Sequence, residues 1–257
     1  MKILTMLQHS TCKTSPARSS FRQRLCRTAA LLLIGTLSFA LHTEAAILHT
    51  FSEPFSSPNG GLPTGWVVSA HGSGSSYIAQ IDPIPETTLQ GLHQQRVGSN
   101  GNSLVYYTGD TGPIENGQFA DFQASVVFRF ADLNGSSRMG IIGRAQNPET
   151  FGTTSDDRLQ GYYALVAASG GSIRGLYLIK DPYGSNATAF ENQTVLVMDG
   201  LPSNLSDNED YLLTFSIKGS QLSANLYAWN ESEAAFSIQL ASVGATDSSY
   251  QVGALGF

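Results

Sequence analysis

The sequence predicts an all-β protein, an antiparallel two-sheet jelly-roll sandwich preceded by a signal peptide. Three observations lead to this prediction: short apolar runs punctuated by Gly, Pro, Asn and Ser, strict alternation within some runs, and no apolar repeat of helical period. The run FQASVVFRF alternates most cleanly, with apolar side chains at every second position from Phe122 to Phe130. Such alternation is typical of an antiparallel strand with one buried face.

The remaining strands are expected wherever an apolar run lies between turn residues. In chain order, strands are predicted at residues 47–51, 66–69, 77–81, 103–109, 122–130, 138–146, 161–169, 172–181, 194–200, 211–217, 222–228, 236–243 and 250–257. The polar segment DPIPETTLQGLHQQRVGSNGNS between two of them is expected to be a loop. The absence of a linker or an internal repeat predicts one β-sandwich domain.

The clearest hairpin is YLLTFSIKGSQLSANLYA, which turns at Lys218-Gly219-Ser220-Gln221. Its expected inward residues are Tyr211, Leu213, Phe215, Ile217, Leu222, Ala224, Leu226 and Ala228. The last predicted strand closes the sequence without a tail. It therefore needs either a neighbour from the N-terminal part or residues missing from a truncated chain.

Residues 1–45 have the composition of a secretory signal. Basic residues precede the apolar run from Ala29 to Leu41, no acid occurs before Glu44, and a small-residue cleavage site follows. The apolar run is too short to span a bilayer, which takes about 20 residues. We therefore predict cleavage near Ala46, a domain at 46–257, a secreted or cell-envelope location, and no transmembrane segment after processing.

The charge balance limits the class of partner. The whole chain has 14 basic and 20 acidic residues and a net charge of −6, and removal of the signal would take six of the basic residues and one acid. Because nucleic acids and anionic lipids are bound by clusters of Lys and Arg, no nucleic-acid partner is expected. Both cysteines, Cys12 and Cys26, lie in the signal, so the mature domain has neither a disulfide nor a thiolate site.

The order of these strands and turns resembles the concanavalin A-like lectin/glucanase superfamily. The residues that carry the resemblance are DFQASVVFRF, GIIGRAQ, GYYALVAASGG, IRGLYLIKD, the hairpin above and VGATDSSYQVGALGF, and the opening FSEPFSSPNGGLPTGW fits it as well. The pattern is most similar to laminin-G-like and 3-keto-disaccharide hydrolase-type modules of exported bacterial proteins. Many such proteins end in a Pro-Glu-Pro sorting tail, which this sequence lacks.

No catalytic motif is found in the sequence, so no catalytic residue is predicted. The glucanase branch uses carboxylates at alternate positions of one strand, and no E-x-D-x-E or E-x-D-x-x-E string occurs. G-x-S-x-G is also absent. The acids of SDNED, Asp207, Glu209 and Asp210, are interpreted as solvated turn residues. A hydrolase of the keto-disaccharide type, with acids converging from separate loops, stays the alternative to a non-catalytic module, as does a purely structural surface protein.

Calcium is the cofactor that the resemblance suggests, because jelly rolls of this kind often hold a loop with this ion through hard oxygen ligands. The candidate ligands are Glu53, Asp156 and Asp157, with Asp132 and Asn134 as a second pair. None has EF-hand spacing, and each is equally suited to a turn hydrogen bond.

A glycan or cell-surface polysaccharide is the expected partner. Sugar binding needs an exposed aromatic ring with polar side chains beside it. On the strands that the resemblance places around the concave sheet, the candidate ligand-binding residues are Arg144, Tyr162, Tyr163, Arg174 and Tyr177. Adjacent Tyr162 and Tyr163 must point to opposite faces, so one belongs to the core. Trp66 and Trp229 are expected to pack in the core or at a sheet edge.

Overall fold

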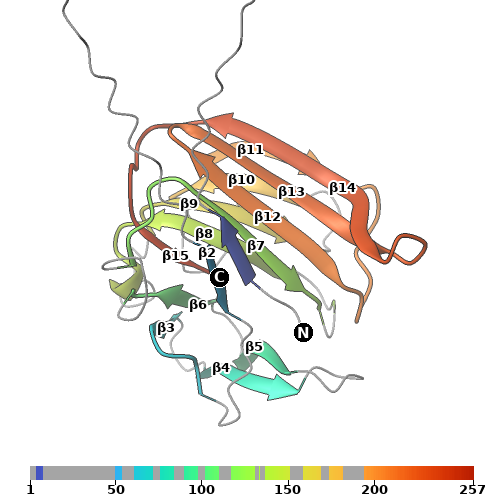
Figure 1. Cartoon of the computed structure of the whole chain (residues 1–257), viewed down its shortest axis with the longest axis horizontal. Coiled ribbons are helices and arrows are strands. Elements are labelled where there is room, and N and C mark those ends of the chain that lie inside the picture. The colour runs from blue at the N-terminus through green and yellow to red at the C-terminus, as the bar shows by residue number, and fades with distance from the viewer. Residues whose placement is uncertain are drawn as a thin grey trace, which may run out of the picture.

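The computed structural model spans residues 1–257 and describes residues 4–7, 50–53, 61–71, 76–83, 90–97, 102–109, 117–130, 133, 137–150, 159–168, 174–181 and 194–257. Two antiparallel sheets lie face to face and enclose the main hydrophobic core (Figure 1). Within these ranges the helical residues are the short 3-10 turn η2 (Pro148–Thr150) and Gly117, which is also in 3-10 conformation. This architecture is a β-sandwich and confirms the predicted fold class.

The first layer is a six-stranded sheet, which faces the viewer in Figure 1. Its strands, in spatial order, are β14 (Ala235–Thr246), β13 (Gln221–Asn230), β12 (Tyr211–Lys218), β7 (Phe122–Phe128), β1 (Leu4–Leu7) and β2 (Thr50–Glu53). The edge strand β14 is the longest, and β13 pairs with it along its whole length.

The second layer is a seven-stranded sheet. Its strands, in spatial order, are β11 (Thr194–Gly200), β10 (Gly175–Lys180), β9 (Tyr162–Ala167), β8 (Arg138–Ala145), β15 (Ala254–Gly256), β6 (Asn102–Tyr107) and β3 (Trp66–His71). A separate hairpin of β4 (Ser76–Pro83) and β5 (Gln90–Val97) lies beside the sandwich (Figure 1). The prediction of a loop over residues 82–103 is therefore wrong for β5, because pairing with β4 forms a strand from a polar sequence without apolar alternation.

The hairpin of β12 and β13 has the predicted phase. All eight expected inward residues lie on the core side, seven of them buried and Ala228 packed against the core. Lys218 pairs with Gln221, which leaves Gly219 and Ser220 as a two-residue turn. Gly219 has φ of 56°, the left-handed conformation that such turns require at the first central position and that glycine adopts without strain.

Strand β7 also has the predicted phase. Phe122 and Phe128 are buried, whereas Val126 is only half-buried. Arg129 points the other way, as expected, but it is not simply exposed. Its Nε donates to the Asp210 carboxylate at 2.8 Å, so the side chain joins the end of β7 to the start of β12.

Aromatic rings connect the two layers through the core. From the seven-stranded sheet, Trp66 stacks on Phe257 and contacts Tyr107, with ring centroids 5.5 Å apart in both pairs. Phe119 then bridges to Phe122 on the six-stranded sheet, at 6.2 Å. The burial of Trp66 confirms its predicted place in the core.

A glycine lets the aromatic packing come this close. A Cβ atom at Gly143 on β8 would lie 2.3 Å from the Phe122 ring and 3.1 Å from the Phe215 ring. The two layers therefore approach each other at Gly143 more closely than any other residue would allow.

The last strand is shorter than predicted, and its neighbours come from the middle of the chain. β15 lies between β8 and β6, inside the seven-stranded sheet. Phe257 and Val105 exchange backbone hydrogen bonds of 2.8 and 3.0 Å. The strand thus obtains its pairing without an N-terminal partner.

Strand β1 lies within the segment predicted to be a signal peptide. It pairs with β2 and, through Thr5 and Met6, with β7. Removal of residues 1–45 stays a prediction, and it would leave β7 without this neighbour.

The depth of the core yields a test of the strand phase. Phe215→Ala should lower the free energy of unfolding by about 3–5 kcal/mol, because Phe215 is fully buried and the truncation leaves a cavity. Ser216→Ala, one residue along on the opposite face, should change it by about 0.5 kcal/mol or less. Urea denaturation of both variants measures the difference, and equal losses would contradict the assigned faces.

Candidate functional site

Arg144 is the predicted ligand-binding residue whose position differs most from expectation. Only 1% of its surface is exposed, so its expected place on an outward face is wrong. Its Nε and Nη1 donate to the carbonyl oxygens of Ala120 and Tyr250 at 2.8 and 2.6 Å, and Nη2 lies 3.3 Å from an Asp121 carboxylate oxygen. Burial lowers the pKa of Arg144, and the charge of Asp121 opposes this effect. The guanidinium is therefore committed to holding the fold.

The adjacent tyrosines of β9 point to opposite faces, as predicted. Tyr162 is fully buried in the main core, and its hydroxyl donates to Asp247 at 2.6 Å. Burial, followed by this hydrogen bond, raises the pKa of Tyr162 to about 12. Tyr163 faces away from the core and is half-buried, and burial raises its pKa strongly.

The other two predicted residues of this group lie apart from Arg144 and Tyr162. Tyr177 is 5% exposed and packs with Tyr163 in a small cluster on the outer side of the seven-stranded sheet. Arg174, half-buried, donates to the Leu201 carbonyl at 3.2 Å and to Asn204 at 2.8 Å. The five predicted residues thus form no common site, and ligand contact by any of them stays a prediction.

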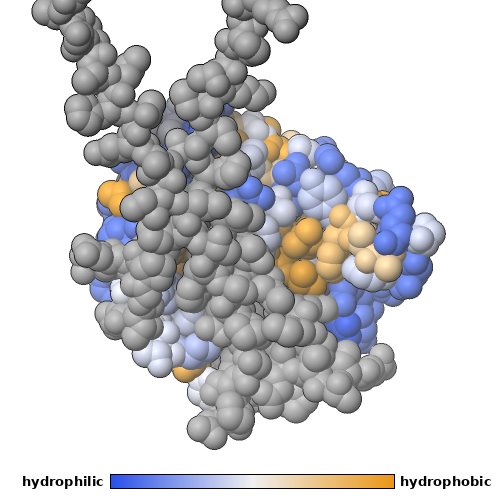
Figure 2. Space-filling model, in the orientation of Figure 1, coloured by the Kyte–Doolittle hydropathy of each residue, from blue (hydrophilic) through white to orange (hydrophobic). Residues whose placement is uncertain are grey.

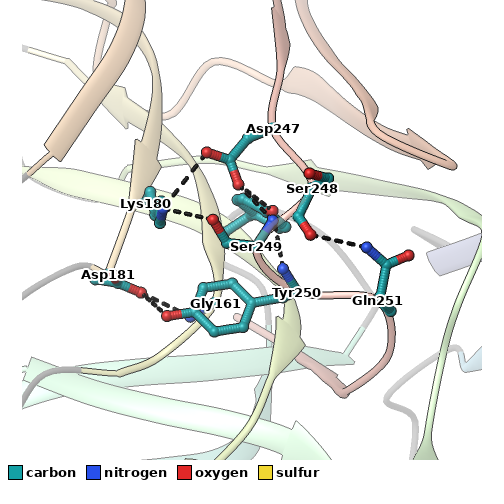
Figure 3. Close-up of polar contacts among 9 residues, drawn as sticks. Gly161, Lys180, Asp181, Asp247, Ser248, Ser249, Tyr250 and Gln251 are labelled. Atoms are coloured by element: carbon teal, nitrogen blue, oxygen red, sulfur yellow. Dashed lines mark hydrogen bonds and ion pairs between the residues drawn. The ribbon is translucent and has the colours of Figure 1, made fainter.

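A polar network joins Tyr162 to the loop between β14 and β15. Figure 3 shows the part of it around Asp247, Asp181 and Tyr250. Asp247 accepts hydrogen bonds from the Tyr162 hydroxyl and from the Ser249 backbone N–H, at 2.6 and 2.8 Å, and lies 3.5 Å from the Lys180 ammonium. The Tyr250 hydroxyl donates to Asp181. Both carboxylates therefore have tyrosine partners, and the loop is fixed to β9 and β10.

Electrostatics make Asp247 unsuited to donating a proton. Burial alone would raise its pKa, but the hydrogen bonds from Tyr162 and Ser249 and the charge of Lys180 together lower the pKa to about 2. A general acid needs a pKa near the working pH, so Asp247 stays ionised at neutral pH. The network can hold a loop in place, but it cannot supply a proton from this carboxylate.

The predicted calcium ligands lie largely beyond what is described. Glu53 is the last residue of β2 and pairs with Leu4, and only its backbone is described. Asp156, Asp157, Asp132 and Asn134 lie outside the described residues. Among the residues that are described, no three His, Cys, Asp or Glu side chains form a group that could hold a metal ion. In the same part of the chain, no helix has the length and apolarity to cross a membrane.

The outer face of β13 and β14 presents two aromatic side chains that the sequence analysis did not include among the candidate ligand-binding residues. Trp229 is 37% exposed and lies opposite the half-buried Phe236, and their ring centroids are 5.1 Å apart at an interplanar angle of 75°. Figure 2, which looks onto the six-stranded sheet, shows an apolar patch on the side where β13 ends and β14 begins. Trp229 and Phe236 form a cross-strand aromatic pair with solvent access.

Uncharged polar side chains continue this face along both strands. The register places Tyr227 opposite Gln239, Asn225 opposite Ser242, and Ser223 opposite Gly244. The β13–β14 face is defined by these outward residues: Ser223, Asn225, Tyr227, Trp229, Phe236, Gln239, Ser242 and Gly244. Every one of them is half-buried or exposed.

Hydrogen bonds hold the middle of this face in one arrangement. The Ser242 hydroxyl donates to the Asn225 side-chain oxygen at 2.8 Å, and the Asn225 amide donates to the Thr214 hydroxyl of β12 at 3.4 Å. Among the described residues, one amide hydrogen of Asn225 and the hydroxyl hydrogen of Thr214 make no further hydrogen bond. The face therefore combines an aromatic pair with ordered donors and acceptors.

The alternation in β13 could have revealed this face. Because Leu222, Ala224 and Leu226 point inward, the same alternation places Trp229 outward. The expectation that Trp229 packs in the core or at an edge is correct only in part: it lies on the strand next to the edge strand but is exposed to solvent.

The fold and this face define an all-β two-sheet sandwich with an exposed aromatic and polar surface. No protein-family model and no curated protein matches the sequence. Among solved structures, the chain is similar to the carbohydrate-binding module CBM66 from Bacillus subtilis, with a TM-score of 0.45 and 16% identity over 72% of this chain and 86% of that chain. A likeness at this level does not extend to a ligand.

The buried guanidinium gives one prediction. Arg144→Ala should lower the free energy of unfolding by about 3 kcal/mol or more, because three acceptors lose their donor inside the protein. Arg144→Lys should recover only part of it, since one ammonium cannot reach all three positions. Arg174→Ala, at a half-buried site, is the control and should cost about 1 kcal/mol. Thermal and urea unfolding measure the losses, and a fully stable Arg144→Ala variant would contradict this role.

The lowered pKa of Asp247 gives a pH prediction. A folded-state pKa of about 2 against an ordinary value of 3.8 means that the ionised carboxylate stabilises the fold above pH 4, and that this contribution disappears as the pH falls toward 2. Asp247→Asn should be less stable than the parent protein at pH 7, and the gap should narrow between pH 4 and 2. Melting temperatures across this range test it, and a gap that stays constant would refute the assignment.

Proposed function

We propose that the chain is an exported, non-catalytic β-sandwich module that binds carbohydrate through the β13–β14 face. The single observation behind the proposal is the exposed pair of Trp229 and Phe236, which continues into uncharged polar side chains. Sugars have apolar C–H faces and polar rims, so their binding sites combine an aromatic surface with hydrogen-bonding side chains.

The geometry of the pair suits a sugar ring. In an edge-to-face arrangement, one ring supports the other and keeps it from collapsing onto the sheet. Trp229 loses little conformational freedom on binding, because its ring already contacts Phe236. A rigid aromatic side chain can therefore stack on a sugar at a small entropic cost.

A binding role is favoured over hydrolysis. The two carboxylates of the polar network, Asp247 and Asp181, each accept a hydrogen bond from a tyrosine hydroxyl, and the lowered pKa of Asp247 keeps it ionised. Sugar hydrolysis requires a carboxyl group that retains its proton, and Asp247 is unsuited to be that group. Export rests on the signal-like composition of residues 1–45, which also supports a secreted or cell-envelope location.

The test is glycan binding by matched variants. The protein is screened on a glycan array, and Trp229→Ala should weaken the affinity for the bound glycan by about 2 kcal/mol, roughly 30-fold, with no fall in melting temperature. Met198→Ala, which removes a comparably exposed apolar side chain from β11 of the other sheet, is the control. A protein that binds no glycan, or a Trp229→Ala variant with parent-like affinity, would refute the proposal.

A further inference from the structure

We infer that the ligand of the β13–β14 face is a neutral, extended glycan whose chain runs along the two strands, from the aromatic pair to Gly244. The inference rests on the proposed function and specifies the class of sugar and its direction on the sheet. Three properties of the face support it: the lack of charge, the length, and the open space at Gly244.

The face has no charged side chain, and acids flank it. All eight of its residues are uncharged. Glu231 and Glu233 are exposed in the turn beyond the aromatic pair, and the Asp199 carboxylate accepts a hydrogen bond from the Ser242 backbone N–H at 3.0 Å. Lys218 lies past the other end, on β12 opposite Gln221. Because like charges repel and no cation lines the face, uronic or sulfated sugars are disfavoured there.

The length of the face fits several sugar rings. Trp229 lies six positions beyond Ser223 on β13, which at about 3.3 Å per residue gives a span of about 20 Å. A chain of about four pyranose rings covers this span when it lies along the strand. One ring would then stack on Trp229, and the others would meet the polar residues.

The polar residues along this path suit hydroxyl groups. A sugar hydroxyl both donates and accepts, and Asn225, Gln239 and Tyr227 each offer a side chain that can do the same. The Ser242–Asn225–Thr214 hydrogen bonds fix the Asn225 side chain before the ligand arrives. Little side-chain entropy is then lost at Asn225 on binding.

Gly244 keeps the far end of the path open. A Cβ atom at this position would meet only the Leu222 carbonyl oxygen, at 3.7 Å, and Gly244 does not have a positive φ. The backbone therefore accepts a side chain there without strain. A bulky residue at 244 would stand on the outward face and occupy the space that the last sugar ring needs.

The experiment combines a steric block with a series of glycan lengths. Linear neutral oligosaccharides of the best glycan from the array are measured by calorimetry from the disaccharide upward, beside acidic oligosaccharides of equal length. The affinity should rise up to about four rings and then level off, and the neutral series should bind more tightly. Gly244→Val should weaken the longest oligosaccharides by about tenfold, close to the value of the chain that is one ring shorter, since the hydrogen bonds lost with the last ring correspond to that factor.

Gly200→Val is the matched control, because Gly200 lies on β11 of the other sheet and a Cβ atom there has no neighbour within 4 Å. It should bind like the parent protein. Two results would overturn the inference while Trp229→Ala still abolishes glycan binding and so leaves the proposed function intact. One is that acidic sugars bind best, and the other is that Gly244→Val has no effect. A protein that binds no sugar overturns both. A concentration-dependent dimer that Gly244→Val disrupts would also overturn both, because a second copy of the chain would then occupy the face.

Discussion

The buried guanidinium of Arg144 is the interaction on which the arrangement of the two layers depends. Arg144 is the last residue but one of β8 in the seven-stranded sheet. Its partners Ala120 and Asp121 lead into β7 of the six-stranded sheet, and Tyr250 lies in the loop before β15. Asp121 also accepts a hydrogen bond from Gly219 in the β12–β13 turn, at 2.8 Å. Since a buried cation without its acceptors is very costly, these segments must hold their positions together.

Alternating residues made the fold predictable, and the exceptions have physical causes. In β7 and in the β12–β13 hairpin, the inward and outward residues follow directly from the period of two, because one face of each strand is buried. Strand β5 has no such period: its sequence QGLHQQRV is mostly polar, with Leu92 packed against the core, and it pairs along its whole length with β4. Sequence patterns detect a strand through burial, so a strand outside the sandwich escapes them.

The candidate site was less predictable because residue type does not reveal which face of which sheet is covered. Arg144 and Tyr177 have the chemistry of a sugar site, yet they are 1% and 5% exposed. Both faces of the seven-stranded sheet are buried around β9 and β10, with Tyr162 in one cluster and Leu165 in another. The alternation that buries Leu226 also exposes Trp229. The sequence therefore predicts on which side of the strand Trp229 lies, but it does not show that no other part of the described chain covers this side.

The sheet edge beside this open, uncharged face could pair with a strand of another chain. Features of the edge itself oppose such pairing. β14 is the edge strand, and its backbone N–H groups would be free to pair with a foreign strand. Asp199 of β11 accepts the hydrogen bond of Ser242 at this edge, so a side chain with a negative charge lies where a new strand would have to approach. The bulges of β14 beside Leu226 and Ala228 further disturb a straight edge. Protection therefore comes from the edge itself, which leaves the outward side chains of β13 and β14 without a need for charge.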